Sequence, residues 1–128
     1  MNGCASGAPE TPLAVVHRYY DAWRTGTADA ITEHLHEDLV GHTGASTIRR
    51  ADVLAWRAAL ASRFSDLHVE SGEELAQDDR VAVVWTSTGR TSSGDAMRWR
   101  GVSTYRIAAD VIVELWEVRS PEVRLPGQ

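Results

Sequence analysis

Two carboxylates within one apolar stretch are the residues most suggestive of chemistry. The run 110–118, DVIVELWEV, alternates as a β-strand does. One face of this predicted strand carries Val111, Val113, Leu115 and Glu117, and the other carries Ile112, Glu114, Trp116 and Val118. A carboxyl group that faces an apolar cavity is desolvated, which raises its pKa and suits a general base or acid. If the Glu117 face is concave, Glu117 is the candidate for catalysis and Glu114 is a surface or interface charge.

A structural role for Glu117 is the alternative. Arg98 and Arg100 lie on the preceding predicted strand, and either could form an ion pair with Glu117. Such a pair would keep the carboxylate permanently charged and would remove it from acid/base chemistry.

Other side chains could complete a pocket around Glu117. Trp85 and Trp99 lie on neighbouring predicted strands, and Tyr20 lies on the first predicted helix. Aromatic rings suit a flat polycyclic ligand because they stack on it, and core packing is their alternative role. His42 ends an early strand, where it is either a pocket residue or a hydrogen-bonded histidine. His34 and His36 could bind metal together with it, but this spacing is weak, and we expect no metal and no cofactor.

Composition excludes several classes of function. The chain has 128 residues, of which 43% are hydrophobic and 24% charged, as expected for one globular domain. All 13 basic residues are arginine, so a lysine Schiff base and a P-loop are excluded. The net charge is −5 and the arginines are dispersed, which argues against nucleic acid as a partner. No apolar run reaches the roughly 20 residues that cross a membrane.

Three helices are expected in the first half of the chain. Pro12 suits the first turn of a helix that Gly26 would end, and Thr27 could cap a short second helix. Thr47 could cap a third helix. Its apolar stripe would consist of Val53, Trp56, Leu60 and Phe64.

Strands dominate the second half. The expected strands are 81–89, 97–107 and 110–118, after a short strand near 38–44 and a strand-like segment from residue 67. Hairpins are expected at 92–95 and at Ala109-Asp110. Helices followed by antiparallel strands indicate an α+β domain over 12–119, with a strongly curved, mostly antiparallel sheet packed on three helices. Residues 1–11 are expected to be a flexible lead and 120–128 a loose tail. The lead holds Cys4, the only cysteine, so no internal disulfide can form and a cytoplasmic location is expected.

Three segments together resemble the SnoaL-like polyketide cyclases of the nuclear transport factor 2-like superfamily. They are VHRYYDAWRTGTADAITEHLHEDLVGH, RFSDLHVESGEELAQDDRVAVVWTSTGR and WRGVSTYRIAADVIVELWEV, and they cover most of residues 12–118. The resemblance implies a cone-shaped α+β barrel. It also implies a catalytic carboxylate after the last strand's tryptophan, which is Glu117 here in place of Asp. Ser103 stands where the family has a pocket His.

The resemblance implies a cofactor-independent enzyme of secondary metabolism. Its reaction would be an intramolecular aldol-type ring closure on an apolar, polyketide-like substrate. Catalysis is expected from Glu117 and His42, with Tyr20, Trp85, Trp99, Ser103 and Leu115 binding the substrate. Another cyclisation, such as a cycloaddition, spirocyclisation or epoxide opening, is the enzymatic alternative, and a non-catalytic binding module is the other. The convex face of the sheet is expected to form a homodimer, with Trp116 and Glu114 near the contact.

Overall fold

The structure, a computed structural model, describes residues 10–126 and has the expected α+β architecture. The helices are α1 (Pro12–Thr25), α2 (Ala28–Thr32) and α3 (Arg50–Arg63). The strands are β1 (Leu35–Thr43), β2 (Ser46–Ile48), β3 (Ser65–Gln77), β4 (Arg80–Arg90), β5 (Ala96–Ala108), β6 (Val111–Arg119) and β7 (Val123–Arg124). Most of the expected lead, including Cys4, lies outside the described residues.

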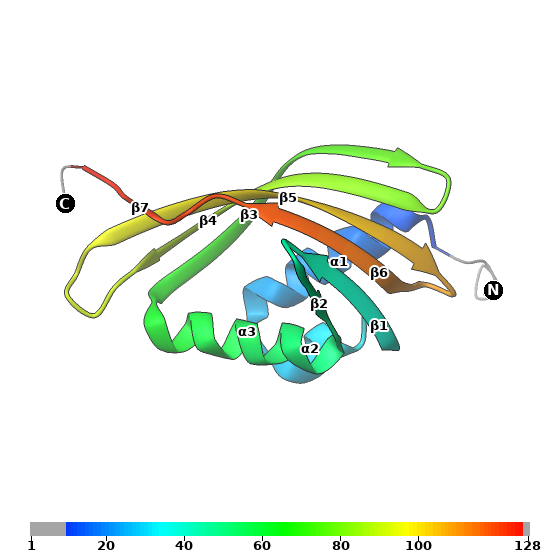
Figure 1. Cartoon of the computed structure of the whole chain (residues 1–128), viewed down its shortest axis with the longest axis horizontal. Coiled ribbons are helices and arrows are strands. Elements are labelled where there is room, and N and C mark those ends of the chain that lie inside the picture. Colours follow the sequence, from blue (N-terminus) through cyan, green and yellow to red (C-terminus); the bar gives the residue numbers. More distant parts are fainter. Residues whose placement is uncertain (1–9, 127–128) are drawn as a thin grey trace, which may run out of the picture.

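One curved sheet organises the described chain. Its strand order is β2-β1-β6-β5-β4-β3, with β7 added beside β5. All neighbouring strands are antiparallel except β1 and β6, which run parallel. The sheet curls without closing into a barrel, and the three helices lie under its concave side (Figure 1). The core therefore forms between the helices and the concave face.

Local signals explain where the first two helices begin and end. The Thr11 hydroxyl accepts a hydrogen bond from the Ala14 amide, and Pro12 occupies the first helical position of α1. Gly26 ends α1 in the left-handed conformation, at φ 76°. Thr27 caps α2, as predicted.

The predicted start of α3 is wrong. Thr47 belongs to β2, where it pairs with His42 in a hairpin, and so it cannot cap a helix. The helix begins after Arg49 instead. Its first turn is closed by Asp52, whose carboxylate accepts a hydrogen bond from the Arg49 amide at 2.8 Å.

The three long C-terminal strands form where the alternation predicted them. The turn between β5 and β6 is Ala109-Asp110, and both residues have positive φ. The register between these strands shifts near Val113, because Arg106 pairs with Glu114 while Ile107 pairs with Ile112. This irregularity reverses the predicted faces at the start of β6. Ile112 is fully buried and Val113 only partly, whereas Leu115 and Glu117 keep the expected concave face.

Residues 122–125, within the expected tail, contact the sheet and α3. Val123 and Arg124 pair with β5, opposite Arg98 and Met97. Glu122 forms an ion pair with Arg63 of α3, and the Leu125 amide donates a hydrogen bond to the Ala96 carbonyl. These contacts anchor residues 122–125 to one end of the sheet.

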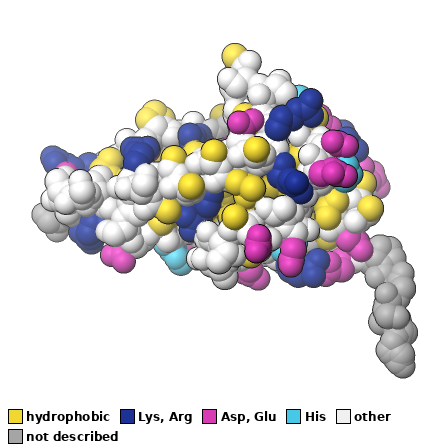
Figure 2. Space-filling view, turned by 90° about the horizontal axis from the view of Figure 1, so that it is seen from below, with side chains coloured by type: hydrophobic (Ala, Val, Ile, Leu, Met, Phe, Trp, Pro, Cys, Tyr) yellow, Lys and Arg dark blue, Asp and Glu magenta, His cyan; other side chains and the backbone are white. Residues whose placement is uncertain are grey.

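Charged side chains of both signs are mixed on the surface. Figure 2 looks at the molecule from below the view of Figure 1, and it shows acidic and basic side chains interspersed around hydrophobic ones. Several arginines have acidic partners, as in the pairs Arg63–Glu122 and Arg106–Glu114.

Candidate functional site

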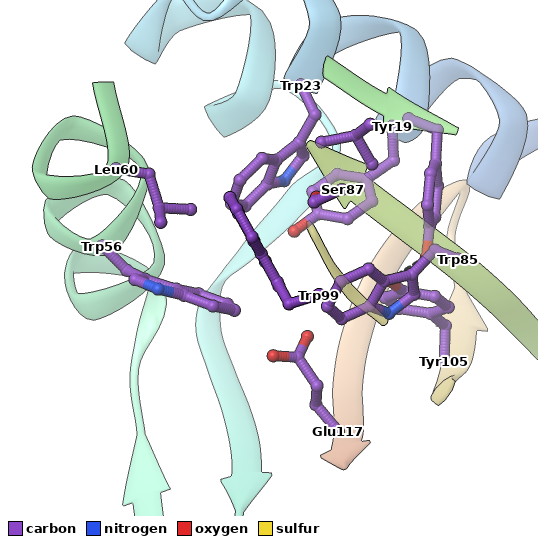
Figure 3. A pocket seen from close by; sticks show the side chains of 11 residues that line it. Tyr19, Trp23, Trp56, Leu60, Trp85, Ser87, Trp99, Tyr105 and Glu117 are labelled. Carbon is purple, nitrogen blue, oxygen red and sulfur yellow. Dashed lines mark hydrogen bonds between the residues drawn. The ribbon is translucent and has the colours of Figure 1, made fainter. Parts of the chain in front are cut away.

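A cavity opens between α1, α3 and the concave face of the sheet. Its volume is about 380 Å³, a figure that includes space open to solvent. Aromatic rings form most of its wall, and Glu117 is the one carboxyl group among the described residues that line it (Figure 3). The lining residues are Tyr19, Tyr20, Trp23, Trp56, Leu60, Val69, Trp85, Ser87, Trp99, Tyr105 and Glu117. We call this space the inner cavity.

The Glu117 side chain points toward the inner cavity (Figure 3). The Ser103 hydroxyl donates a hydrogen bond to Glu117 Oε1 at 3.2 Å. Within residues 10–126 Glu117 forms no ion pair, and Arg98 and Arg100 are exposed on a stretch of β5 whose buried residues are Trp99 and Gly101. Burial raises the pKa of Glu117 above its ordinary value, and the Ser103 hydrogen bond and the Arg119 charge only partly oppose this rise.

Ser103 links the carboxylate to a buried polar network. The Trp85 Nε1–H donates to Ser103 Oγ at 2.9 Å, and Ser103 is fully buried. Beside them the hydroxyls of Tyr20 and Tyr105 share a hydrogen bond of 2.8 Å. Burial raises the pKa of both tyrosines well above the ordinary value, so both remain neutral donors at physiological pH.

Backbone geometry at Gly101 makes room for this network. A Cβ at Gly101 would collide with the Trp85 ring and come within 2.8 Å of the Val118 carbonyl oxygen. The absence of a side chain therefore lets the Trp85 indole lie across β5 and reach Ser103.

One indole in the wall is under-satisfied. Trp23 Nε1 is buried and has no hydrogen-bond partner among the described residues. Burial raises the pKa of the Tyr19 hydroxyl, and the nearby Trp23 N–H only partly opposes this rise. A buried donor at a cavity wall is available to a ligand acceptor.

A second, outer cavity adjoins the first. It has a volume of about 430 Å³, again counting space open to solvent, and Trp56 and Glu117 line both cavities. Its other lining residues are Thr43, Ile48, Asp52 and Arg119. The Arg119 guanidinium stacks on the Trp56 ring, 4.1 Å from its centroid. The Glu117 carboxylate thus lies between an aromatic chamber and one whose wall includes the charged side chains of Asp52 and Arg119.

His42 does not join Glu117. Because His42 pairs with Trp116 in the sheet, its side chain lies on the convex face. There it stacks on the Trp116 ring with centroids 5.4 Å apart, and its Nε2 lies 2.8 Å from the Glu114 carboxylate. Hydrogen bonds from His42 and Arg106 lower the pKa of Glu114. The structure therefore places the histidine predicted for catalysis in a convex cluster, in the hydrogen-bonded role that was its alternative.

The structure brings together most of the other predicted site residues. Tyr20, Trp85 and Trp99 line the inner cavity, and Ser103 contacts Glu117. Leu115 is buried beside Gly41 and does not line this cavity. Tyr105, Trp56 and Arg119 were missed. Each had a signal, because Tyr105 alternates with Ser103, Arg119 alternates with Glu117, and Trp56 lies on the predicted stripe of α3.

No group of three or more His, Cys, Asp or Glu side chains in residues 10–126 is placed to hold a metal ion. None of the helices within residues 10–126 is both long enough and apolar enough to cross a membrane.

Comparison with known proteins identifies the protein family to which the chain belongs. Residues 16–115 match the model of the SnoaL-like domain, so the chain belongs to the SnoaL-like family, as the sequence motifs predicted. No curated protein matches the sequence.

Solved structures show the same fold at low sequence identity. AclR from Streptomyces galilaeus, described as a candidate hydroxylase, is 24% identical with a TM-score of 0.79, over 85% of this chain and 78% of that one. IdmH from Streptomyces antibioticus, described as a candidate polyketide cyclase, is 18% identical with a TM-score of 0.79, over 87% and 93%. A SnoaL-like protein from Jannaschia sp. CCS1, also a candidate polyketide cyclase, is 17% identical with a TM-score of 0.74, over 85% of each chain.

Proposed function

We propose that this protein is a cofactor-independent cyclase or isomerase that acts on an apolar, polyketide-like substrate, with Glu117 as its general base. Glu117 would remove a proton from a carbon next to a substrate carbonyl. The resulting enolate would attack a second carbonyl of the same molecule and close a ring. Names given to structural relatives, polyketide cyclase among them, agree with this class of substrate.

The observation that carries the proposal is the environment of the Glu117 carboxylate. It faces an aromatic cavity, it accepts a hydrogen bond from Ser103, and it has no ion-pair partner within the described chain. A carboxylate with a raised pKa is a stronger base than one in water, and it begins the reaction less solvated. The aromatic walls would hold a flat substrate in reach of it.

The test is proton exchange at the carbon next to a ketone. Bicyclic and tricyclic aromatic ketones, with 1-tetralone first, would be incubated with the protein in D₂O and followed by proton NMR. The wild type should accelerate exchange, and Glu117→Gln should slow the catalysed rate about 10²–10⁴-fold.

Glu114→Gln is the matched control, because it removes a carboxylate from the same strand on the opposite face. It should exchange at nearly the wild-type rate. Equal rates for the wild type and Glu117→Gln, or no catalysed exchange with any ketone in the series, would contradict the proposal.

A binding module that holds a metabolite without converting it is the second candidate. The observation in its favour is Ser103, which the sequence resemblance places where the family has an ionisable histidine. Within residues 10–126 the hydrogen-bond partner of Glu117 is this serine, which is not titratable. Tight binding of these ketones without exchange would favour this candidate.

A further inference from the structure

The outer cavity has no assigned role in proton abstraction, and its wall includes one cationic side chain, Arg119, beside the proposed base. Arg119 follows Glu117 by two residues on β6, and both side chains line this cavity. The Arg119 guanidinium lies over the Trp56 ring and forms no ion pair with the described residues. A stacked guanidinium keeps its edge N–H donors free for an acceptor.

We propose that Arg119 binds the negatively charged oxygen of the substrate's enolate. The outer cavity would then bind the edge of the substrate that carries this oxygen, while the rest of the substrate is apolar. This inference rests on the proposed function and names a second catalytic residue for it. The aromatic body of the substrate would occupy the inner cavity, and its carbonyl would project past Glu117 toward Arg119.

Charge balance supports this assignment. When the C–H bond breaks, the proton moves to the Glu117 carboxylate and the electron pair moves through the new C=C bond onto the carbonyl oxygen. Glu117 becomes neutral and the oxygen becomes negative. One unit of negative charge thus moves from the Glu117 carboxylate to the substrate oxygen, and a guanidinium beside that oxygen would stabilise the charge as it develops.

The other charged group of the outer cavity does not cancel Arg119. Asp52 accepts a hydrogen bond from the Arg49 amide at 2.8 Å, at the N-terminal end of α3. Its carboxylate is therefore engaged by the first turn of the helix. Asp52 and Glu117 are the acidic groups among the lining residues, and Arg119 is the basic one.

Binding of a stable anion tests the inference without relying on turnover. The probe is 2-naphthoate, compared with its neutral analogue 2-naphthamide by isothermal titration calorimetry. The measurements use the Glu117→Gln protein, because glutamine reproduces the neutral state of the base after proton transfer. This protein should bind 2-naphthoate at least about tenfold more tightly than 2-naphthamide, because a charge-assisted hydrogen bond favours the anion; tenfold corresponds to about 1.4 kcal/mol.

Adding Arg119→Met should abolish that preference, because methionine keeps much of the stem on Trp56 but carries no charge. Adding Arg98→Met, on the other face of the sheet, should preserve it. Circular dichroism checks that every variant is folded. A preference that survives Arg119→Met, an equal affinity of Glu117→Gln for both compounds, or no binding of either would overturn the inference.

The two proposals can fail separately. Glu117-dependent exchange without an Arg119-dependent anion preference would leave the base in place and remove Arg119 from the mechanism. An Arg119-dependent preference without catalysed exchange would leave an anion-binding pocket and remove the proposed base.

Discussion

At the scale of single residues, the same strand holds two glutamates in opposite environments. Glu117 is desolvated in the cavity wall, and its pKa is raised. Glu114 lies among His42 and Arg106 on the convex face, and its pKa is lowered. Their neighbours, rather than their position in the sequence, separate a candidate base from a surface ion pair.

The two glutamates should change stability with pH in opposite directions. A raised folded-state pKa means that the folded protein binds the Glu117 proton more tightly than the unfolded chain does. Protonated Glu117 therefore contributes to the free energy of unfolding at low pH, and this contribution is lost as pH rises through the folded-state pKa. Glu117→Gln should therefore raise the melting temperature relative to wild type more at pH 8 than at pH 4.

Glu114 has the reverse sign, because its folded-state pKa is lowered. Its contribution is present above the ordinary glutamate pKa and is lost as pH falls. Glu114→Gln should lower the melting temperature at pH 8 and have little effect at pH 3. Thermal unfolding followed by circular dichroism measures both series, and parallel pH trends for the two variants would refute the assignment of their environments.

Ser103 should matter for both stability and activity. Ser103→Ala leaves the buried Trp85 N–H without its acceptor and removes the hydrogen bond to Glu117. We expect a loss of about 1–3 kcal/mol in the free energy of unfolding. The pH at which exchange activity is half-maximal should rise, since that hydrogen bond lowers the Glu117 pKa. Urea unfolding and a pH–rate profile measure these effects, and an unchanged profile would show that Ser103 does not support the carboxylate.

At the scale of elements, the turns and irregularities of the sheet decide which side chains reach the cavity. The shift near Val113 turns Ile112 into the core and leaves Leu115 and Glu117 on the concave face. The β5–β6 turn sets this register, and Ala109 adopts φ 52° there at a steric cost of about 1–2 kcal/mol.

Ala109→Gly should stabilise the protein. Glycine removes the steric cost but gives the unfolded chain more freedom, which offsets about 0.4–1 kcal/mol of the gain. The net gain should be about 0.5–1 kcal/mol, or about 2–5 °C in melting temperature. Ala108→Gly, one residue earlier and within β5, should instead destabilise by a similar amount. Differential scanning calorimetry decides, and a lower melting temperature for Ala109→Gly would contradict the turn geometry.

At the scale of the whole molecule, the convex face carries an apolar row across three strands. Val84, Val102 and Val118 are paired across β4, β5 and β6, and Val118 is 75% exposed. Trp116 lies beside this row, between the His42 ring and the Arg80 guanidinium. We propose that this face is the contact of a homodimer.

Val118→Asp should disrupt that dimer. A carboxylate in the middle of a self-associating face would lie near its symmetry-related copy and would be desolvated. Sedimentation velocity at micromolar concentration should show a dimer for the wild type and a monomer for Val118→Asp. Ala58→Asp, a change at an exposed residue of α3 on the concave side of the sheet, should stay dimeric. A monomeric wild type would rule out the proposal.

The sequence by itself determined the order of elements, the antiparallel strands, the family and the identity of Glu117 as the carboxylate to examine. These features follow from local signals, namely periodicity, capping residues and sequence motifs, which can be recognised without information about contacts between distant residues. Only the tertiary structure decided that His42 lies on the convex face and that Tyr105, Trp56 and Arg119 meet at the site. Those placements depend on strand register, on the irregularity at Val113 and on the packing of α3 over the sheet. Local patterns assign each of these residues to a face of its own element, but they do not say which faces meet, because that relation joins residues far apart in the chain.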